Sequence, residues 1–374
     1  MCVTKYVLCL LAVSGLSASF IVHAQSAASE TPKPSSSPTT LSVDVKVVTL
    51  PVTVRDKKGQ LVSNLTKDDF ILQEDNRPQT IKYFNLDTNL PLTLGLLIDT
   101  SMSMRNAFDQ EKNSGKTFLN QMLVKPEDKA FTLHFDREVE LLQDLTASKD
   151  KLASSLEDLG PTRQSLSSSD SDSGQHAHHG GGTQLYDAIY LASDELMKKQ
   201  QGRKAVVVLS DGQDRGSRET LNSAIEAAQR ANTVVYTIYF QGEQQHDNDN
   251  NGGYGRRGGT GGGWPGGGGG WPGGGGGRYP GGGGGQRPSS EPHVDGKKIM
   301  IQIAEQTGGR MFEAKKKENF DQIYASIAEE LRQQYMLGYT PDKSSDSSGF
   351  HKIELTTKKK DLYVQTRDGY YADK

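Results

Sequence analysis

The sequence has little cysteine: the 374 residues include two, Cys2 and Cys9. Both lie in an N-terminal segment with one lysine, an apolar run that ends at Ile21, and a small-residue motif that ends at Ala24. This pattern is typical of a secretory signal peptide, so we expect residues 1–24 to be removed on export. The mature chain would then lack both disulfides and thiol chemistry.

Long apolar runs and an excess of one charge are also missing. Beyond the N-terminal segment no stretch reaches the roughly 20 apolar residues that span a bilayer. The net charge is −3, from 43 basic and 46 acidic residues that are interspersed, and the lysine clusters at 315–317 and 358–360 are short. These features favour neither nucleic acid nor a membrane span. We expect a secreted or periplasmic protein.

One stretch stands at the centre of the sequence. Residues 92–98 are apolar or glycine at six of seven positions, which predicts a strand buried on both faces. The run stops at Asp99, and two hydroxyls follow at Ser101 and Ser103. Polar oxygens at the carboxyl end of such a strand mark the crevice where open α/β sheets bind ligands. A plainer interpretation is that Ser103 caps a helix beginning near Arg105.

Two later stretches place oxygen atoms in similar contexts. Thr183 precedes a helical pattern that begins near Tyr186, and Asp211 follows a second buried strand, residues 204–210. The order D-x-S-x-S, then T, then D resembles the metal-ion-dependent adhesion site of the von Willebrand factor type A (VWA) domain. The positions that carry this resemblance are Asp99, Ser101, Ser103, Thr183 and Asp211.

The resemblance implies a divalent cation. Ser101, Ser103 and Thr183 would bind it directly, and Asp99 and Asp211 would act mostly through waters. Oxygen ligands suit Mg²⁺, the expected cofactor, or Mn²⁺ or Ca²⁺, rather than zinc or copper. Neutral direct ligands leave the ion under-neutralised, so an open position can attract an Asp or Glu carboxylate from a protein partner. The implied function is a secreted adhesion or scaffolding module.

Strand and helix patterns alternate over residues 91–334, which predicts a doubly wound, mostly parallel α/β sheet. Residues 41–90 and 335–374 carry strand patterns instead. Because two- or three-stranded pieces are marginal in water, we expect these flanks to form one small β-sandwich with the α/β domain inserted between them. The flanks also resemble the bacterial secreted VWFA-related group, through residues 65–70 (Leu-Thr-Lys-Asp-Asp-Phe) and 350–353 (Phe-His-Lys-Ile).

The same patterns give approximate bounds for the elements. Expected helices cover residues 105–122, 148–159, 186–199, 218–231, 297–306 and 319–334. Expected strands cover residues 43–54, 70–73, 80–84, 92–98, 131–135, 139–142, 204–210, 234–240, 310–312, 335–339, 350–356 and 362–366.

Two segments before and within the α/β domain are biased in composition. Residues 25–40 are rich in Ser, Thr, Pro and Ala, which predicts a disordered linker. Residues 165–182 are Ser-rich and carry three histidines, His176, His178 and His179. These side chains could hold a transition metal, or the segment could be a solvated loop. We favour the loop, because no helix or strand fixes the ligands.

A third biased segment, residues 242–290, contains 24 of the 42 glycines. Trp-Pro, Trp-Pro and Tyr-Pro pairs each precede five glycines, and both tryptophans of the chain, Trp264 and Trp271, lie here. The aromatic-Pro units could be contacts for polysaccharide or another chain. We favour an expanded, weakly constrained loop, because glycine buries little apolar area.

An enzyme is the main alternative. Residues 98–101 are similar to the hydrophobic-Asp-Thr-Ser signature of aspartic proteases, which would make Asp99 and Asp211 a catalytic pair. The second acid, however, comes as Ser-Asp-Gly, and the expected scaffold is α/β. A nucleophilic Ser101 lacks both the G-x-S-x-G elbow and a placed histidine. We therefore expect no catalysis. A structural envelope protein without metal function is the other alternative, and the intact five-residue set argues against it.

Overall fold

The structure is a computed structural model that describes residues 47–86, 90–160, 182–241, 295–314, 320–342 and 348–372. The predicted signal peptide, the linker at 25–40, the histidines of the Ser-rich loop and the Gly-rich loop at 242–290 lie outside the described residues. Within them, no helix is long and apolar enough to cross a membrane.

A six-stranded sheet forms the centre of the α/β domain, with strand order β10-β9-β8-β5-β6-β7. All neighbouring strands are parallel except β7, which pairs antiparallel with β6. The predicted mostly parallel sheet is therefore confirmed. The strands are β5 (Leu92–Asp99), β6 (Lys129–Phe135), β7 (Val139–Thr146), β8 (Arg203–Ser210), β9 (Val234–Phe240) and β10 (Met311–Ala314).

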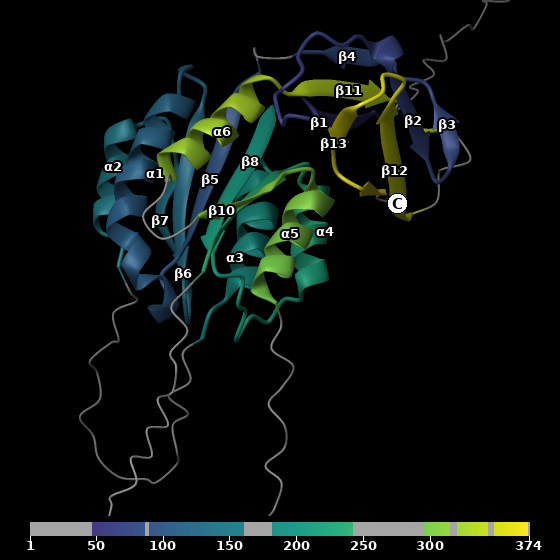
Figure 1. The fold of residues 1–374 in the computed structure, drawn as a ribbon. Helices are drawn as coiled ribbons and strands as arrows, with labels where there is room; N and C mark the ends of the chain where they lie inside the picture. Colours follow the sequence, from purple (N-terminus) through teal and green to yellow (C-terminus); the bar gives the residue numbers. More distant parts are fainter. Residues whose placement is uncertain are drawn as a thin grey trace, which may run out of the picture. The chain divides into compact units, whose positions relative to one another are not determined.

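Helices cover both faces of this sheet (Figure 1). On one face lie α1 (Phe108–Met122), α2 (Lys149–Glu157) and α6 (Phe320–Arg332). On the other lie α3 (Leu185–Leu191), α4 (Leu221–Arg230) and α5 (Gly296–Thr307). Every residue of β5 is buried, and its side chains alternate between the two cores: Leu96 packs in the first and Leu97 in the second. The expected burial of this strand on both faces is confirmed.

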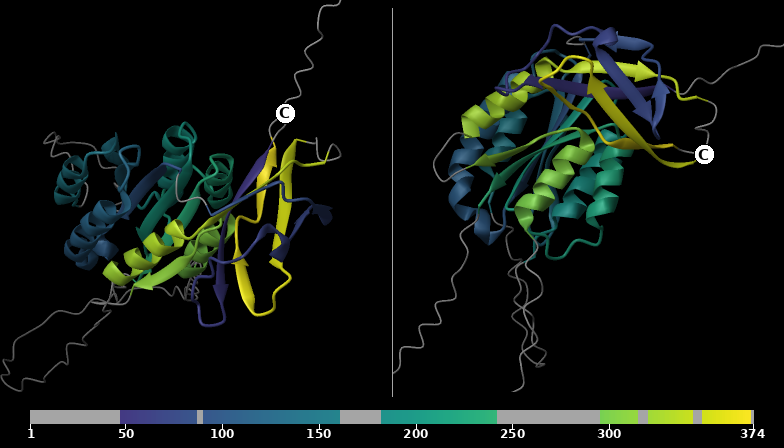
Figure 2. Two further views of the ribbon diagram at one scale, coloured as in Figure 1. Left: turned by 90° about the horizontal axis from the view of Figure 1, so that it is seen from above. Right: turned by 45° about the vertical axis from the view of Figure 1, so that its right-hand side comes forward.

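The flanking segments build two four-stranded antiparallel sheets, ordered β13-β1-β11-β4 and β14-β12-β2-β3. Strand β11, from the C-terminal flank, lies between two N-terminal strands, and β12 pairs with β2. The two flanks thus interleave (Figure 2), and the predicted shared sandwich is confirmed. The strands are β1 (Val48–Asp56), β2 (Phe70–Glu74), β3 (Arg77–Gln79), β4 (Tyr83–Asn85), β11 (Tyr335–Tyr339), β12 (Gly349–Thr357), β13 (Leu362–Gln365) and β14 (Gly369–Ala372).

Polar contacts join the sandwich to the α/β domain. Arg55 of β1 pairs with Glu330 of α6 at 2.6 Å, and Arg310 pairs with the same carboxylate at 2.5 Å. The buried Arg367 donates to the carbonyl oxygens of Gln229 in α4 and Thr49 in β1. The C-terminal flank therefore fastens both β1 and α4.

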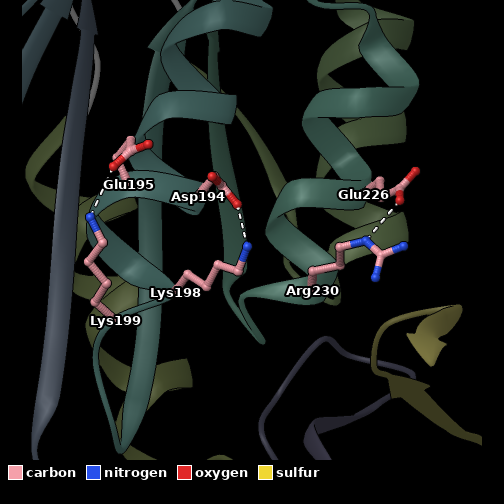
Figure 3. A network of polar contacts seen from close by, with 6 residues as sticks. All are labelled: Asp194, Glu195, Lys198, Lys199, Glu226 and Arg230. Carbon is pink, nitrogen blue, oxygen red and sulfur yellow. Dashed lines mark hydrogen bonds and ion pairs between the residues drawn. The ribbon is translucent and has the colours of Figure 1, made fainter. Parts of the chain in front are cut away.

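Ion pairs between residues four positions apart lie on the surface of η3 (Ala192–Met197) and α4 (Figure 3). Lys198 pairs with Asp194, and Arg230 pairs with Glu226, both at 2.8 Å. Such pairs contribute only about 0.2–0.5 kcal/mol each to a helix. The Arg230 guanidinium also lies 4.7 Å from the ring centroid of Tyr371, which adds a contact between α4 and β14.

Several predicted bounds are wrong. The helix expected at 105–122 begins as a 3-10 segment, η2 (Met102–Ala107), because Met104 N bonds to Ser101 O in a three-residue turn. The helix expected at 186–199 continues beyond α3 as a π segment, η3 (Ala192–Met197), in which Lys198 N bonds to Ser193 O. The helix expected from residue 218 begins at Leu221, because Thr220 caps it by accepting from Ser223 N.

The sandwich also differs in detail from the prediction. The strand expected at 80–84 begins only at Tyr83, as β4, and an unpredicted strand, β3, precedes it at Arg77–Gln79. These two strands belong to different sheets, so the chain crosses the sandwich at residues 80–82. Strand β14 was not predicted. Its residues pair with the start of β12, a partner about 20 positions away.

Candidate metal centre

The five candidate ligands lie at the carboxyl edge of the central sheet. Asp99 ends β5, and Asp211 directly follows β8. These strands are parallel neighbours in which Ile98 is level with Leu209, so the two aspartates emerge next to each other. This edge is where open α/β sheets bind ligands.

Asp99 is fully buried and held by both strand-end loops. Its Oδ1 accepts a hydrogen bond from Ser101 N at 2.9 Å, and its Oδ2 accepts one from Ser210 Oγ at 2.6 Å. Ser210 Oγ in turn accepts from Gly212 N at 3.0 Å. The carboxylate is therefore oriented before any ligand arrives.

The two serine hydroxyls lie side by side, with Ser101 Oγ 3.0 Å from Ser103 Oγ. Both residues are partly buried. Ser101, not Ser103, occupies the position before η2, and its side chain makes no capping hydrogen bond. The interpretation of Ser103 as a helix cap is therefore wrong. The two hydroxyls therefore lie within hydrogen-bond distance of each other.

Thr183 is buried and reaches the same edge through backbone hydrogen bonds. Its carbonyl oxygen accepts from Arg215 N, in the loop after β8, at 2.8 Å. The next residue, Gln184, donates from its backbone N to the carbonyl oxygen of Asp136, just after β6, at 2.8 Å. The segment before α3 is thus fastened between the loops that follow β6 and β8.

The loop after β8 depends on a glycine. Asp211 is partly buried, and its Oδ1 accepts from Gln213 N at 3.0 Å. Gly212 has a φ of 74°, and a Cβ there would lie 2.2 Å from Gly296 O. A larger residue would push the loop away from α5 and displace the Asp211 carboxylate.

The electrostatics of this edge favour a cation. Burial, and next the charge of Asp211, raise the pKa of Asp99 to about 7. Burial, followed by the charge of Asp99, also raises the pKa of Glu111, a fully buried residue of α1. A divalent cation beside Asp99 and Asp211 would relieve the repulsion between their carboxylates. The hydroxyl and carboxylate oxygens present fit Mg²⁺ or Mn²⁺.

Comparison with known proteins agrees with this geometry. Residues 94–213 match the family model described as the von Willebrand factor type A domain. The chain carries a VWA domain. A search of curated proteins returns no match.

Solved structures with a similar fold include three proteins of low sequence identity. Proximal thread matrix protein 1 from the mussel byssus is 14% identical with a TM-score of 0.43, over 69% of this chain and 51% of that one. BatB from Bacteroides thetaiotaomicron is 14% identical with a TM-score of 0.38, over 64% and 97%. The vWF domain of the type V pili tip protein Mfa5 from Porphyromonas gingivalis is 11% identical with a TM-score of 0.40, over 66% and 96%.

The match to the mussel protein spans about half of that protein's length. Another structure of it has a zinc-occupied MIDAS motif.

Two polar residues of the VWA domain near Asp99 were not predicted from the sequence. Ser210 binds Asp99 from the neighbouring strand, a contact 111 residues apart that no local pattern reveals. Glu111 had a detectable signal, because it lies at core-facing helical spacing from Phe108 and Phe118, yet it is acidic. Both Glu111 carboxylate oxygens are buried without a hydrogen-bond partner among the described residues.

A histidine, His134, lies beside Thr100 rather than Ser101. His134 Nδ1 is 3.2 Å from Thr100 Oγ1, and its Nε2 is 2.9 Å from a Glu140 carboxylate oxygen. Thr100, His134 and Glu140 thus form a row of polar contacts. Its hydroxyl belongs to Thr100, which is 1% exposed, rather than to Ser101. A buried hydroxyl is inaccessible to a substrate, so the row connects β5, β6 and β7 without offering a nucleophile.

Proposed function

We propose that this protein binds a protein partner through a divalent cation held by its VWA domain, as an adhesion or scaffolding module outside the cytoplasm. A VWA domain supports a role as a protein-interaction module. The finer assignment is that Ser101, Ser103 and Thr183 ligate Mg²⁺ or Mn²⁺ directly. Asp99 and Asp211 would orient waters on the same ion.

The observation that carries this proposal is the pre-arranged hydroxyl pair beside two carboxylates. Ser101 and Ser103 point their oxygens at each other instead of capping η2. Asp99 is already oriented by two hydrogen bonds. When bound, the ion would offer an open coordination position to a partner's Asp or Glu carboxylate. The chain's own residues would bind and orient the ion.

A hydrolase is the weaker candidate. Aspartic-protease chemistry needs paired carboxylates that share a proton in contact with substrate. Asp99 is fully buried, with each carboxylate oxygen occupied by a hydrogen bond from its own chain. The buried Thr100–His134–Glu140 row offers no accessible nucleophile either.

The test is calorimetric titration of the full chain with Mg²⁺ and Mn²⁺. We expect Asp99→Ala to abolish binding. Asp99→Asn is the companion variant that removes the charge: its amide oxygen can still accept from Ser101 N, and its NH2 group can donate to Ser210 Oγ. Asp144→Ala, at an exposed acid of β7, is the matched control and should bind like the parent. Undiminished binding by both Asp99 variants would refute the assignment.

A partner is sought by affinity capture with and without chelator. We expect a captured protein to be released by chelator and to be absent with Asp99→Asn. Metal-independent capture would place the partner elsewhere on the chain. Stabilisation by the ion is a poor readout here, because linkage gives only about 0.4 kcal/mol when the metal concentration equals its dissociation constant.

A further inference from the structure

A second group of metal-ligating side chains lies in the sandwich. Glu74 ends β2, Asp75 begins the turn to β3, and His351 lies on β12, which pairs with β2. One ligand atom from each residue lies within 4.8 Å of the other two. None of the three belongs to the VWA site.

The distances match a small cation. His351 Nδ1 is 2.9 Å from an Asp75 carboxylate oxygen and 3.6 Å from Glu74 Oε1. A tetrahedral Zn²⁺ with bonds of about 2.0–2.2 Å holds its ligand atoms roughly 3.3–3.6 Å apart. The remaining distance, between the Glu74 and Asp75 oxygens, is at most 4.8 Å. Shifts of no more than about 1 Å would therefore place the three atoms around one ion.

The buried carboxylate of Glu74 is not fully hydrogen-bonded among the described residues. The residue is 0% exposed, and its Oε2 has no hydrogen-bond partner among the described residues. Its Oε1 receives a long hydrogen bond of 3.3 Å from the Tyr370 hydroxyl. The His351 Nδ1 proton is directed to Asp75, at the shorter distance. A buried carboxylate in this state is stabilised by a nearby cation.

The surrounding charges leave room for that cation. Arg367, the buried guanidinium nearby, donates to Gln229, Asn232 and Thr49 rather than to Glu74. Asp75 Oδ1 accepts from Lys352 N at 2.9 Å, which orients its other carboxylate oxygen toward His351.

We propose that Glu74, Asp75 and His351 form a second divalent-cation site, suited to zinc, that cross-links β2, its turn and β12. One imidazole with two carboxylates is a ligand set for zinc or another late first-row metal, in contrast to the hydroxyl-rich VWA site. Metal binding displaces the Nδ1 proton of His351 to solvent. The Asp75 side chain, 44% exposed, marks the entry, since the other two side chains are buried.

The experiment is zinc titration of the full chain in the Asp99→Asn background, which silences the proposed VWA site. Asp75→Asn is added as the test variant. The amide oxygen of the introduced asparagine can still accept from Lys352 N, and its NH2 group can donate to the neutral Nδ1 of His351. Asparagine also tolerates the Asp75 φ of 48°, so the turn is preserved while the anionic ligand is lost. Asp68→Asn, at an exposed acid of the same sandwich, is the matched control.

We expect Asp75→Asn to weaken one zinc equivalent by about tenfold or more, with Asp68→Asn unchanged. Zinc should also raise the melting temperature of the Asp99→Asn chain, and Asp75→Asn should lose this rise. His351→Gln, with its fold checked by circular dichroism, should behave in the same way. Equal zinc affinity and stoichiometry with and without Asp75→Asn would overturn the proposal and leave the cluster as an ion pair. Any zinc taken by other segments is common to all variants and cancels in the comparison.

Discussion

Replacing Glu330 removes the centre of a buried charge triad. Its two carboxylate oxygens lie 2.6 Å from Arg55 Nη2 and 2.5 Å from Arg310 Nη2. The Glu330 side chain is 2% exposed, that of Arg55 10% and that of Arg310 38%. Glu330→Ala therefore leaves Arg55 buried without its counter-charge, whereas Arg310 can turn toward water.

Breaking a buried ion pair costs about 3–5 kcal/mol. Because Arg310 is partly exposed, we expect the lower end, about 3 kcal/mol. For a chain of this size each kcal/mol lowers the melting temperature by about 2–4 °C, so Glu330→Ala should lower it by about 6–12 °C. Calorimetry, with fold monitored by circular dichroism, measures this shift.

The control is Asp361→Asn, which breaks the exposed pair with Lys57. Asparagine tolerates the Asp361 φ of 68°, so only the ion pair is lost, at about 0–1 kcal/mol. Replacing the whole triad, as Arg55→Met, Arg310→Met and Glu330→Leu together, should be close to neutral, because it leaves no buried charge. If Glu330→Ala lowers the melting temperature no more than Asp361→Asn does, the triad is not a fastening between the sandwich and the VWA domain.

Three further predictions test other parts of the chain. Burial raises the pKa of Glu111 well above 4.5, so the folded state binds its proton more tightly and the free energy of unfolding falls as pH rises above that value. Glu111→Met should remove this loss and stabilise the protein by about 1–3 kcal/mol near pH 8 but less near pH 5; equal melting temperatures of parent and variant at both pH values would contradict this. Gly212→Ala should weaken Mg²⁺ binding and lower the melting temperature, since its Cβ would lie 2.2 Å from Gly296 O at a φ of 74°; calorimetric binding equal to the parent's would show that the loop relaxes. Deleting residues 252–285 should change the melting temperature by no more than a few degrees and leave the Mg²⁺ affinity unchanged within error, because glycines bury too little apolar area to stabilise a fold. Loss of the cooperative unfolding transition would show that the segment has a structural role.

The elements that the sequence predicted best are those whose signal is local. The burial of β5 on both faces follows from residues 92–98, of which six of seven are apolar or glycine. The proximity of Asp99, Ser101 and Ser103 could also be predicted from the sequence, because residues two positions apart at a strand end have little freedom to separate. The assignment of these residues, with Thr183 and Asp211, as metal ligands stays a prediction.

Other features of the protein depend on contacts between residues far apart in the chain, so only the tertiary structure reveals them. Strand order, the crossing between β3 and β4, and the placement of β14 arise from pairing partners that no periodicity encodes. The pairing of β2 with β12 brings His351 beside Asp75 across 276 positions. Sequence pattern thus determined which segments are strands and helices, because side-chain periodicity is local. The fold determined which polar groups meet, because burial and charge act through space.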